Sequence, residues 1–423
     1  MNNLSTEMNN VLSRIPDDAQ TTLETLINWS EINSGSTHRA GLDTMRQILA
    51  AAFSLLPGQV RELALRAGET VNSRGEIKYT QYAPALLIEV RPEAEIQLVL
   101  TGHYDTVFPK DSAFQKTKLL GDGRLGGPGV ADMKGGILVM LSALAAFESY
   151  EQAGRVGYSV LLSPDEEIGS PGSAPVLHEL GTRADVGLTY EPALADGSLA
   201  GARKGSGNFT LIIHGRAAHA GREHHLGRNA IAAMARFAAS LDALNGKREG
   251  VTFNIAKIEG GGPVNIVPDL AVGRFNVRMQ ELADMDWIKE QLDRLVSQIN
   301  AEDGLTAELK GGFTRPPKPM APANALVFDW VRQAGQALGL DISWAPSGGV
   351  CEGNNLWAAG CANVDTLGVV GGHIHSDKEY MEIDSLVSRA QLSALILMQI
   401  AAGEFDARQA KKLALQAQKT EGN

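Results

Sequence analysis

Short, nearly uninterrupted apolar runs constrain the fold of this chain more than any other feature. They are residues 96–100, 158–162, 186–188 and 366–370. Because a strand buried on both faces needs no alternation of polar and apolar residues, each run is typical of an inner strand of a parallel sheet. Residues 135–147 are apolar almost all round, which predicts a helix packed against that sheet. The pattern predicts a layered α/β domain with a largely parallel sheet.

The middle of the chain follows a different pattern. Residues 271–279 alternate between apolar and polar side chains, as in a strand with one packed and one solvated face. Two helices and three further strands are predicted around it, at residues 209–214, 228–245, 252–258, 286–300 and 305–310. The order β-α-β-β-α-β predicts a small two-layer α+β domain inserted into the larger one.

The domain boundaries follow from these two patterns. Residues 1–205 are predicted to form the first part of the larger domain, residues 206–313 the inserted domain, and residues 314–423 the second part. The proline-rich residues 315–319 mark the return to the larger domain. A chain of 423 residues has room for two or three domains of about 150 residues each.

Charge and cysteine content exclude several classes of protein. The chain has 38 Lys and Arg against 49 Asp and Glu and no marked basic run, so we expect neither nucleic acid nor an anionic membrane as a partner. Cys351 and Cys361 are too few for a disulfide framework or a thiolate zinc site. We find neither an apolar signal region nor a run of about 18 uncharged apolar residues, and we expect a cytoplasmic protein.

Histidine and carboxylate side chains follow each apolar run, in residues 101–105, 163–167, 189–192 and 371–376. Because ligands of open α/β sheets bind at the carboxyl ends of the strands, we expect these side chains to lie together. So many carboxylates would repel one another and raise their pKa values unless a divalent cation neutralises them. Imidazole and carboxylate ligands without thiolates suit zinc, with cobalt or manganese as alternatives.

A set of short motifs resembles the M20 metallopeptidase family, in particular its carboxypeptidase G2-like (glutamate carboxypeptidase) branch. The motifs are H-x-D at 103–105, G-x-x-D-M-K-G-G at 129–136, D-E-E-x-G-S at 165–170, E-P at 191–192 and H-S-x-x-E-Y at 375–380. The resemblance implies a zinc-exopeptidase-like catalytic domain with a mixed, largely parallel sheet and an inserted ferredoxin-like lid and dimerisation domain. It also implies a homodimer, formed through the inserted domain, that acts on a small peptide or an N-acyl amino acid.

The resemblance further implies a centre of two zinc ions. The side chains that would hold the ions are those of His103, Asp132, Glu167, Glu191 and His375. Asp132 would bridge the two ions, a role that suits its rigid place before the buried helix. Asp105 would hydrogen-bond the ring of His103 and set its tautomer. Glu166 would be the general base, and because consecutive residues of an extended segment point to opposite sides, it would face away from Glu167.

The inserted domain carries candidates for binding substrate. His219 resembles the family's lid histidine, which helps to stabilise the oxyanion across a dimer interface. Asn265, Arg278 and Arg315 resemble residues that bind the substrate carboxylate, which a guanidinium group matches with two parallel hydrogen bonds. Lys204 lies near the hinge and is a further candidate. A structural histidine and solvated arginines are the alternative interpretation of these residues.

Three patterns compete with these assignments. His373 lies beside His375 and is an alternative ligand, although the spacing to the following Glu-Tyr pair favours His375. The histidines at 224–225 lie in a charged loop, where a solvated pair is expected. Residues 121–126 match G-x-G-x-x-G, but Gly-Pro-Gly follows, so no helix can begin there to bind a pyrophosphate.

The chain departs from the family pattern G-G-x-S-D, because Cys351 and Glu352 replace the commoner Ser and Asp. The longer carboxylate of Glu352 is expected to reshape the pocket floor. We expect a dinuclear zinc hydrolase that cleaves a peptide or N-acyl amide bond next to a free carboxylate and releases a C-terminal amino acid, with glutamate as a candidate. Two alternatives are an aminoacylase or deacetylase acting on N-acyl amino acids, and a family member that binds without catalysis.

Overall fold

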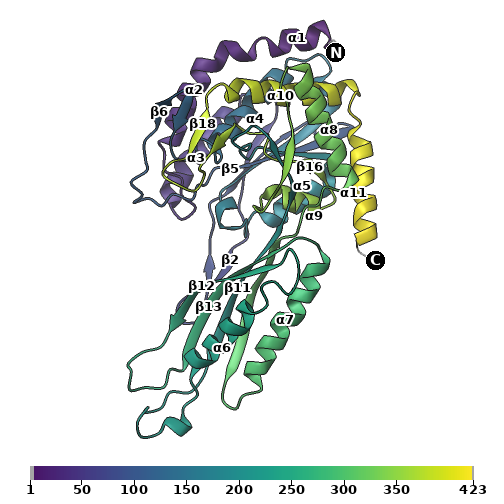
Figure 1. Ribbon diagram of the computed structural model, residues 1–423. Coiled ribbons are helices and arrows are strands. Elements are labelled where there is room, and N and C mark those ends of the chain that lie inside the picture. The colour runs from purple at the N-terminus through teal and green to yellow at the C-terminus, as the bar shows by residue number, and fades with distance from the viewer. Residues whose placement is uncertain (1–3, 422–423) are drawn as a thin grey trace. The chain divides into compact units, whose positions relative to one another are not determined.

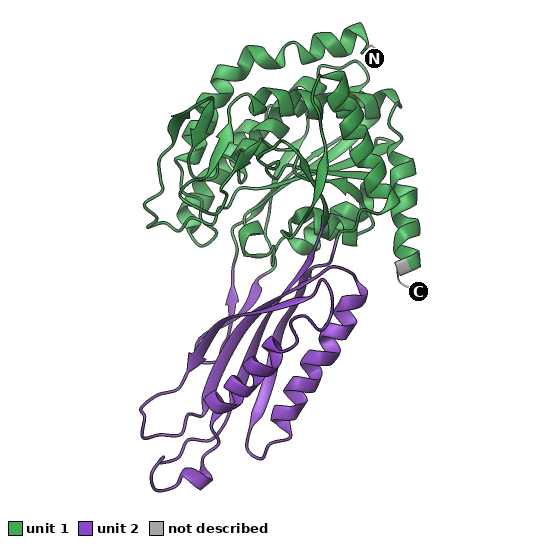
Figure 2. Cartoon of the chain, viewed as in Figure 1, with its two compact units in different colours: residues 1–66, 82–202, 318–423 green, residues 67–81, 203–317 purple. Residues whose placement is uncertain are grey.

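The computed structural model describes residues 4–421 and divides the chain into two compact units (Figures 1 and 2). Unit 1 comprises residues 1–66, 82–202 and 318–423, and unit 2 comprises residues 67–81 and 203–317. The predicted inserted domain, residues 206–313, therefore begins and ends a few residues inside unit 2. The hairpin at residues 67–81 belongs to unit 2, although the prediction placed it in the first part of the larger domain. Residues 1–3 and 422–423 of the predicted outer segments lie outside the described residues.

Unit 1 is built on a six-stranded mixed sheet of order β1-β4-β8-β5-β9-β16. Its strands are β1 (Gln59–Leu63), β4 (Ala85–Val90), β5 (Ile96–His103), β8 (Val156–Ser163), β9 (Val186–Thr189) and β16 (Ala362–Val364). β8, β5, β9 and β16 are parallel neighbours, whereas β4 runs antiparallel to both strands beside it. The predicted largely parallel sheet is confirmed, and three of the four apolar runs form its inner strands.

The fourth apolar run does not form the predicted strand. Residues 366–370 lack strand structure, apart from an isolated bridge between Val370 and Ala193, and the parallel strand is β16, which ends before them. Thr366 has a φ of 66°, in the left-handed region, which turns the chain at the start of the run. Apolar residues therefore mark a buried segment here, but the backbone turn at Thr366 prevents a strand.

Helices cover both faces of the sheet (Figure 1). Leu98 and Leu100 of β5 belong to the large cluster that includes α4 (Lys134–Phe147) and α10 (Ser385–Ala402). Val99 belongs to the smaller cluster with α5 (Ala174–Arg183) and α9 (Glu352–Ala358). Because successive strand residues point to opposite faces, an uninterrupted apolar run is what a sheet covered on both sides requires.

The other elements of unit 1 surround this sheet. Its remaining helices are α1 (Thr6–Leu12), α2 (Ala19–Ser30), α3 (Arg39–Phe53), α8 (Pro322–Ala337) and α11 (Ala407–Glu421), with 3₁₀ turns η1 (Ile15–Asp18), η2 (Ala153–Arg155) and η3 (Glu166–Ile168). A four-stranded sheet joins β17 (Gly371–Gly372), β18 (Tyr380–Glu382), β7 (Arg124–Gly126) and β6 (Lys118–Gly121), and β10 (Leu199–Arg203) pairs with β15 (Trp344–Ser347). Among the described helices, α10 alone is long and apolar enough to cross a membrane, but 78% of it is buried, as expected of a core helix.

Unit 2 contains an antiparallel sheet of order β12-β13-β11-β14 with two helices. Its elements in chain order are β11 (Gly205–His214), η4 (His224–Leu226), α6 (Ala230–Asp242), β12 (Thr252–Gly260), β13 (Leu270–Met279), α7 (Ala283–Asn300) and β14 (Thr306–Arg315), preceded by the hairpin β2 (Gly68–Val71) and β3 (Ile77–Thr80). The predicted β-α-β-β-α-β order is confirmed. Alternation along β13 leaves Phe275 and Val277 in a core separate from that of unit 1.

Candidate metal centre

The carboxyl ends of the inner strands of unit 1 carry the candidate ligands. His103 ends β5, Glu167 lies in the turn η3 that follows β8, and Glu191 follows β9 by two residues. Asp132 precedes α4 by two residues, and His375 lies between β17 and β18. His103, Glu167 and Glu191 thus lie at one edge of the sheet, and Asp132 lies at the start of the helix packed on it, as the sequence predicts.

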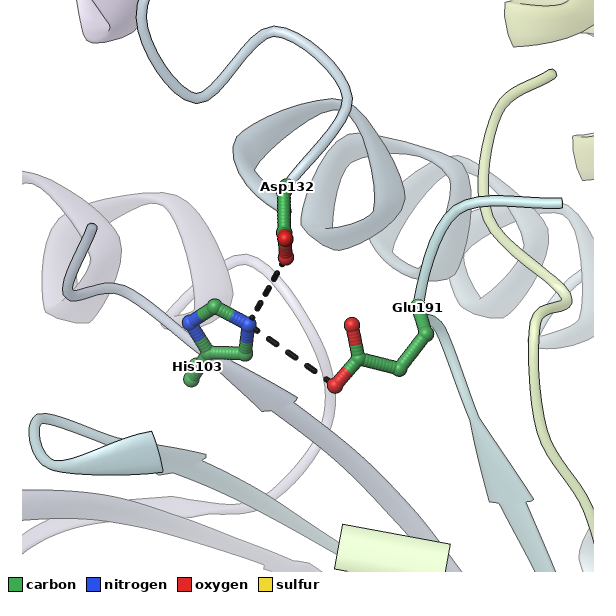
Figure 3. Close-up of side chains that lie close together, drawn as sticks. All are labelled: His103, Asp132 and Glu191. Atoms are coloured by element: carbon green, nitrogen blue, oxygen red, sulfur yellow. Dashed lines mark hydrogen bonds and ion pairs between the residues drawn. The ribbon is translucent and has the colours of Figure 1, made fainter. Parts of the chain in front are cut away.

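The five side chains form two groups that share one aspartate. In the first group, His103 Nε2 lies 3.1 Å from Asp132 Oδ1 and 3.8 Å from Glu191 Oε1 (Figure 3). In the second group, His375 Nε2 lies 3.1 Å from Asp132 Oδ2 and 3.2 Å from Glu167 Oε2. Asp132 therefore presents a different oxygen to each group, as a carboxylate that bridges two cations does.

The separations and the donor set fit a pair of divalent cations. Around a tetrahedral zinc ion with bonds of about 2.0–2.1 Å, neighbouring ligand atoms lie about 3.3 Å apart. In each group the ligand atoms lie within 4.8 Å of one another. Glu167 Oε1 and Glu191 Oε1 are buried and accept no hydrogen bond from any described residue. Buried carboxylate oxygens without a partner are costly, and a cation would neutralise them.

The charges of the cluster shift the pKa values of its members. Burial acts to raise the pKa of Asp132, but hydrogen bonds from His103 and His375 outweigh it and lower that pKa. Burial and the charge of Asp132 raise the pKa of Glu167 to about 8. Hydrogen bonds to Asp132 and Glu167 raise the pKa of His375 to about 11. Both shifts favour the protonated forms of Glu167 and His375, and cation binding would displace these protons because metal ligands must be deprotonated.

Asp105 is fully buried and contacts a residue of each ligand group. Its backbone oxygen lies 3.0 Å and its Oδ1 3.3 Å from Nδ1 of His103, so the ring contact that the resemblance implies is present through both oxygens. Its carboxylate also accepts the N–H groups of Glu166 and Glu167, each at 3.2 Å, and the hydroxyl of Ser36 at 2.7 Å. Asp105 therefore orients His103 and the turn that carries both glutamates.

Glu166 lies outside both ligand groups, but for a different reason from the one expected. Residues 166–168 form the 3₁₀ turn η3 and not an extended segment, so the alternation argument for Glu166 and Glu167 is wrong. The carboxylate of Glu167 contacts His375, whereas Glu166, which is 6% exposed, belongs to neither group. The backbone N–H groups of both residues are bound to Asp105, which holds the turn in place.

The structure places the three competing patterns outside the candidate ligand groups. His373 packs against Tyr380, with ring centroids 5.8 Å apart. Among residues 4–421, neither His373 nor the histidines at 224–225 belong to a group that could hold a metal ion. The histidines at 224–225 lie exposed in η4. Within the glycine-rich residues 121–126, residues 122–123 form the tight turn between β6 and β7, and no helix begins there. His375, at a φ of 62°, is held in a conformation that non-glycine residues rarely adopt.

His219 and Asn265 lie on neighbouring exposed segments of unit 2. An isolated bridge pairs His219 with Ile266, and the backbone oxygen of Asn265 accepts the N–H of Ala220 at 2.9 Å. The ring nitrogen Nδ1 of His219 accepts the N–H groups of Gly221 and Arg222 at 3.1 and 3.2 Å. The ring is thus oriented with Nδ1 toward its own loop.

Arg278 and Arg315 flank the same residue of β11. Ser206 pairs with Arg278 of β13 on one side and with Arg315 of β14 on the other. Burial and the charge of Arg315 lower the pKa of Arg278, and Arg278 Nη1 is buried without a hydrogen bond. Lys204 donates to the backbone oxygen of Gly250 at 3.2 Å. Two partly or fully buried guanidinium groups so close together favour an anionic ligand.

Three residues near the ligands were missed by the sequence analysis as functional candidates. Glu379 accepts backbone N–H groups from the loop that carries Asp132, and Lys134 donates to the backbone oxygens of Trp29 and Ile32 at 3.1 and 2.7 Å. Ser36 hydrogen-bonds Asp105. Glu379 could have been found because it lies in the same motif as His375, and Lys134 because it lies in the same motif as Asp132. No pattern marks Ser36, which is 69 residues from its partner.

Comparison with known proteins places the chain in a family. It matches the model of Peptidase family M20/M25/M40 over residues 99–399. It is 27% identical over 413 residues to carboxypeptidase G2 of Pseudomonas sp. strain RS-16, covering 95% of this chain and 94% of that protein. It is 29% identical over 280 residues to a succinyl-diaminopimelate desuccinylase of Nitrosospira multiformis, covering 63% of this chain and 72% of the relative.

A solved structure shows the same fold. The crystal structure of a Staphylococcus aureus tripeptidase matches with a TM-score of 0.70 at 24% identity, covering 91% of this chain and 99% of that one. The mixed six-stranded sheet and the separate antiparallel sheet are thus a known architecture. The family match extends from β5 into α10 and includes all five candidate ligands. The chain accordingly belongs to Peptidase family M20/M25/M40 and is an enzyme of the metallopeptidase and amidohydrolase kind.

Proposed function

We propose that this enzyme is a dinuclear zinc hydrolase that cleaves a peptide or N-acyl amide bond next to a free carboxylate and releases a C-terminal amino acid, glutamate being the first candidate. The observation that carries the proposal is Asp132, whose two oxygens lie 3.1 Å from the ring nitrogens of His103 and His375. The similarity to a carboxypeptidase over 95% of the chain supports release of a C-terminal residue.

The residues around Asp132 have distinct roles in the proposed reaction. Two zinc ions in this centre would lower the pKa of a bound water and polarise the scissile carbonyl. Glu166 precedes the ligand Glu167 and belongs to neither ligand group. In the proposed reaction it accepts the proton of the attacking water and returns it to the leaving amine. Asp105 accepts the backbone N–H groups of Glu166 and Glu167 and so positions the turn that carries both carboxylates.

Arg278 and Arg315 support a substrate with a free carboxylate. The two side chains flank Ser206 in adjacent strands of unit 2, and the pKa of Arg278 is lowered by burial and by Arg315. A carboxylate between them would relieve the repulsion and accept bidentate hydrogen bonds. His219, Asn265 and Lys204 remain candidates for contacts to the same substrate.

An aminoacylase or deacetylase is the second candidate, because the chain is also similar to a desuccinylase, which by its name removes an acyl group. A panel of dipeptides, N-acyl glutamates and N-acetyl amino acids, compared by kcat/KM, separates the two. Turnover of peptides and N-acyl glutamates supports the carboxypeptidase assignment. Turnover of acetylated amino acids alone would contradict it, and no turnover by fully metallated enzyme would favour a binding protein.

The base assignment has its own test. Glu166→Ala and Glu166→Gln are expected to lower kcat by roughly 10²–10⁴-fold, because proton transfer is lost, while zinc content stays at the wild-type level. Glu179→Ala, on the exposed surface of α5, is the control and should leave kcat unchanged. Wild-type kcat in both Glu166 variants would refute the assignment.

Assembly and location remain predictions. We propose a homodimer formed through unit 2, in which β12 and β14 are the edge strands, with His219 contributing across the interface. The chain's charge and cysteine content support a cytoplasmic location.

A further inference from the structure

The carboxylate of Glu379 is buried beneath the loop that carries Asp132. Glu379 is 1% exposed, and its Oε1 accepts the N–H groups of Ala131 at 2.9 Å and Asp132 at 3.0 Å. Its Oε2 accepts the N–H of Gly129 at 3.2 Å. Three N–H groups of one loop thus converge on a single carboxyl group, the arrangement of an anion-binding backbone nest whose acceptor is supplied by the chain itself.

Glu379 belongs to the segment that also carries His375. The N–H of Gly127 donates to the backbone oxygen of Glu379 at 3.2 Å, and Tyr380 pairs with Gly126 where β18 lies against β7. The segment with His375 and the segment with Asp132 are therefore joined by backbone and side-chain hydrogen bonds within a few residues of both ligands. These hydrogen bonds fix the positions of Asp132 and His375 relative to each other.

Asp132 is the ligand that both candidate groups share. Its two oxygens contact two different rings, at 3.1 Å each, so a rotation of the side chain or backbone must keep both contacts. The N–H of Asp132 is held by Glu379, which limits that rotation. A shift of about 1 Å in a catalytic group is enough to lower a rate by roughly 10²-fold.

We propose that Glu379 is the positioning residue that holds Asp132 between the two halves of the metal centre, an inference that rests on the proposed dinuclear function. Glu379 touches neither the ring of His103 nor that of His375 through any described hydrogen bond, so it acts through the backbone of Asp132 and is not itself a ligand. The H-S-x-x-E-Y motif thereby combines one ligand with the residue that orients another.

The test is Glu379→Gln, which keeps the size of the side chain but turns one acceptor oxygen into an N–H₂ donor. That donor faces a backbone N–H, so at least one of the three hydrogen bonds is lost. We expect zinc affinity, measured by calorimetric titration of the folded, chelator-treated protein, to fall roughly 10–100-fold for at least one ion. We also expect kcat to fall while KM stays within about twofold, because substrate contacts are unchanged.

Asp284→Asn is the matched control. Asp284 is 3% exposed, and its carboxylate accepts the N–H groups of Gln280 at 3.1 Å and Glu281 at 2.9 Å in unit 2. It should lower thermal stability but leave zinc affinity and kcat at wild-type values. If Glu379→Gln does the same, the role of Glu379 is only structural and the inference fails.

Glu379→Asp keeps the charge on a shorter side chain and covers the case in which Glu379→Gln does not fold. The inference predicts an intermediate loss of zinc affinity in Glu379→Asp, and wild-type affinity in it would contradict the inference. Failure of the proposed function is distinguishable, because it would appear in the wild-type protein as fewer than two bound zinc ions, whatever the variants do.

Discussion

Glu352 is fully buried at the start of α9, where its Oε1 lies 2.5 Å from the hydroxyl of Ser163. Burial raises the pKa of this carboxyl to about 8, although the hydrogen bond from Ser163 acts to lower it. Ser163 of β8 is paired with His103 at the end of β5. Glu352, the residue that departs from the family pattern, therefore lies next to the strand end that carries a candidate ligand. At neutral pH the carboxyl is expected to be mostly protonated.

The raised pKa predicts how stability depends on pH. The folded-state pKa of Glu352, about 8, exceeds the ordinary value of 4.5, so its contribution to stability is fully present below 4.5 and is lost as pH rises to about 8. The slope is at most about 1.4 kcal/mol per pH unit. In Glu352→Gln, a neutral side chain of the same size, this contribution does not change with pH.

Urea unfolding of chelator-treated wild type and Glu352→Gln between pH 5 and 9 checks this prediction. The wild type should lose stability relative to the variant as pH rises, and the difference should level off above about pH 8. Parallel stability profiles of the two proteins would contradict it.

Single residues differ in how well the sequence predicts them. His103 and Glu191 could be predicted as site residues because each follows a buried apolar run. In the structure they belong to the same candidate ligand group. The role of Glu379 could not, because it acts on backbone N–H groups of residues about 250 positions away, and no spacing of side chains records such a contact. The burial that raises the pKa of Glu352 likewise depends on the packing of the folded chain and is not visible in the sequence.

At the scale of elements, α4 is the helix on which the metal centre depends. It begins two residues after Asp132, and its second and third residues, Gly135 and Gly136, lie against other backbone segments. A Cβ at Gly136 would lie 2.0 Å from the backbone oxygen of Tyr190, the residue before Glu191. The absence of a side chain there lets α4 approach the segment that carries Glu191.

Gly136→Ala is therefore expected to destabilise the protein. Alanine favours helix by up to about 1 kcal/mol over glycine, but the overlap with Tyr190 must be relieved by moving backbone, at about 2–3 kcal/mol or more. The net effect should be a loss of unfolding free energy and weaker zinc binding, because Glu191 moves with Tyr190. Urea denaturation and zinc titration of the variant measure both.

Gly154→Ala in η2 is the control, since a Cβ there would meet nothing within 4 Å. It should change stability by no more than about 0.5 kcal/mol. Equal stability of Gly136→Ala and wild type would show that the close approach of α4 is not required.

The elements themselves could be predicted where side-chain pattern decides the backbone. The runs that form β5, β8 and β9 have no polar interruptions, and the alternation along β13 reflects one solvated face. The strand predicted at residues 366–370 did not form, because Thr366 turns the chain. The extended segment predicted at Glu166 and Glu167 is a 3₁₀ turn, because Asp105 binds its backbone N–H groups. Both failures lie where distant contacts determine the backbone.

At the scale of the whole molecule, the chain forms two units with separate cores. The clusters around β5 lie entirely in unit 1, and the cluster with Phe275 lies entirely in unit 2. The inserted order β-α-β-β-α-β could be predicted from periodicity. The association of the hairpin β2–β3 with unit 2 could not, because it depends on contacts such as that between Arg274 and the backbone oxygen of Val71, at 2.7 Å.

All five candidate ligands lie in unit 1, whereas the candidates for binding the substrate carboxylate lie in unit 2. The ligands and the proposed base belong to unit 1, and the guanidinium groups belong to unit 2. Both candidate ligand groups lie within unit 1, so the binding of metal can be measured without reference to substrate.

Elemental analysis of zinc in the purified, zinc-dialysed protein tests this account most directly. The shared carboxylate of Asp132 predicts two zinc ions per chain, and loss of hydrolytic activity when chelation removes them. A single ion per chain, or full activity after exhaustive chelation, would contradict the account.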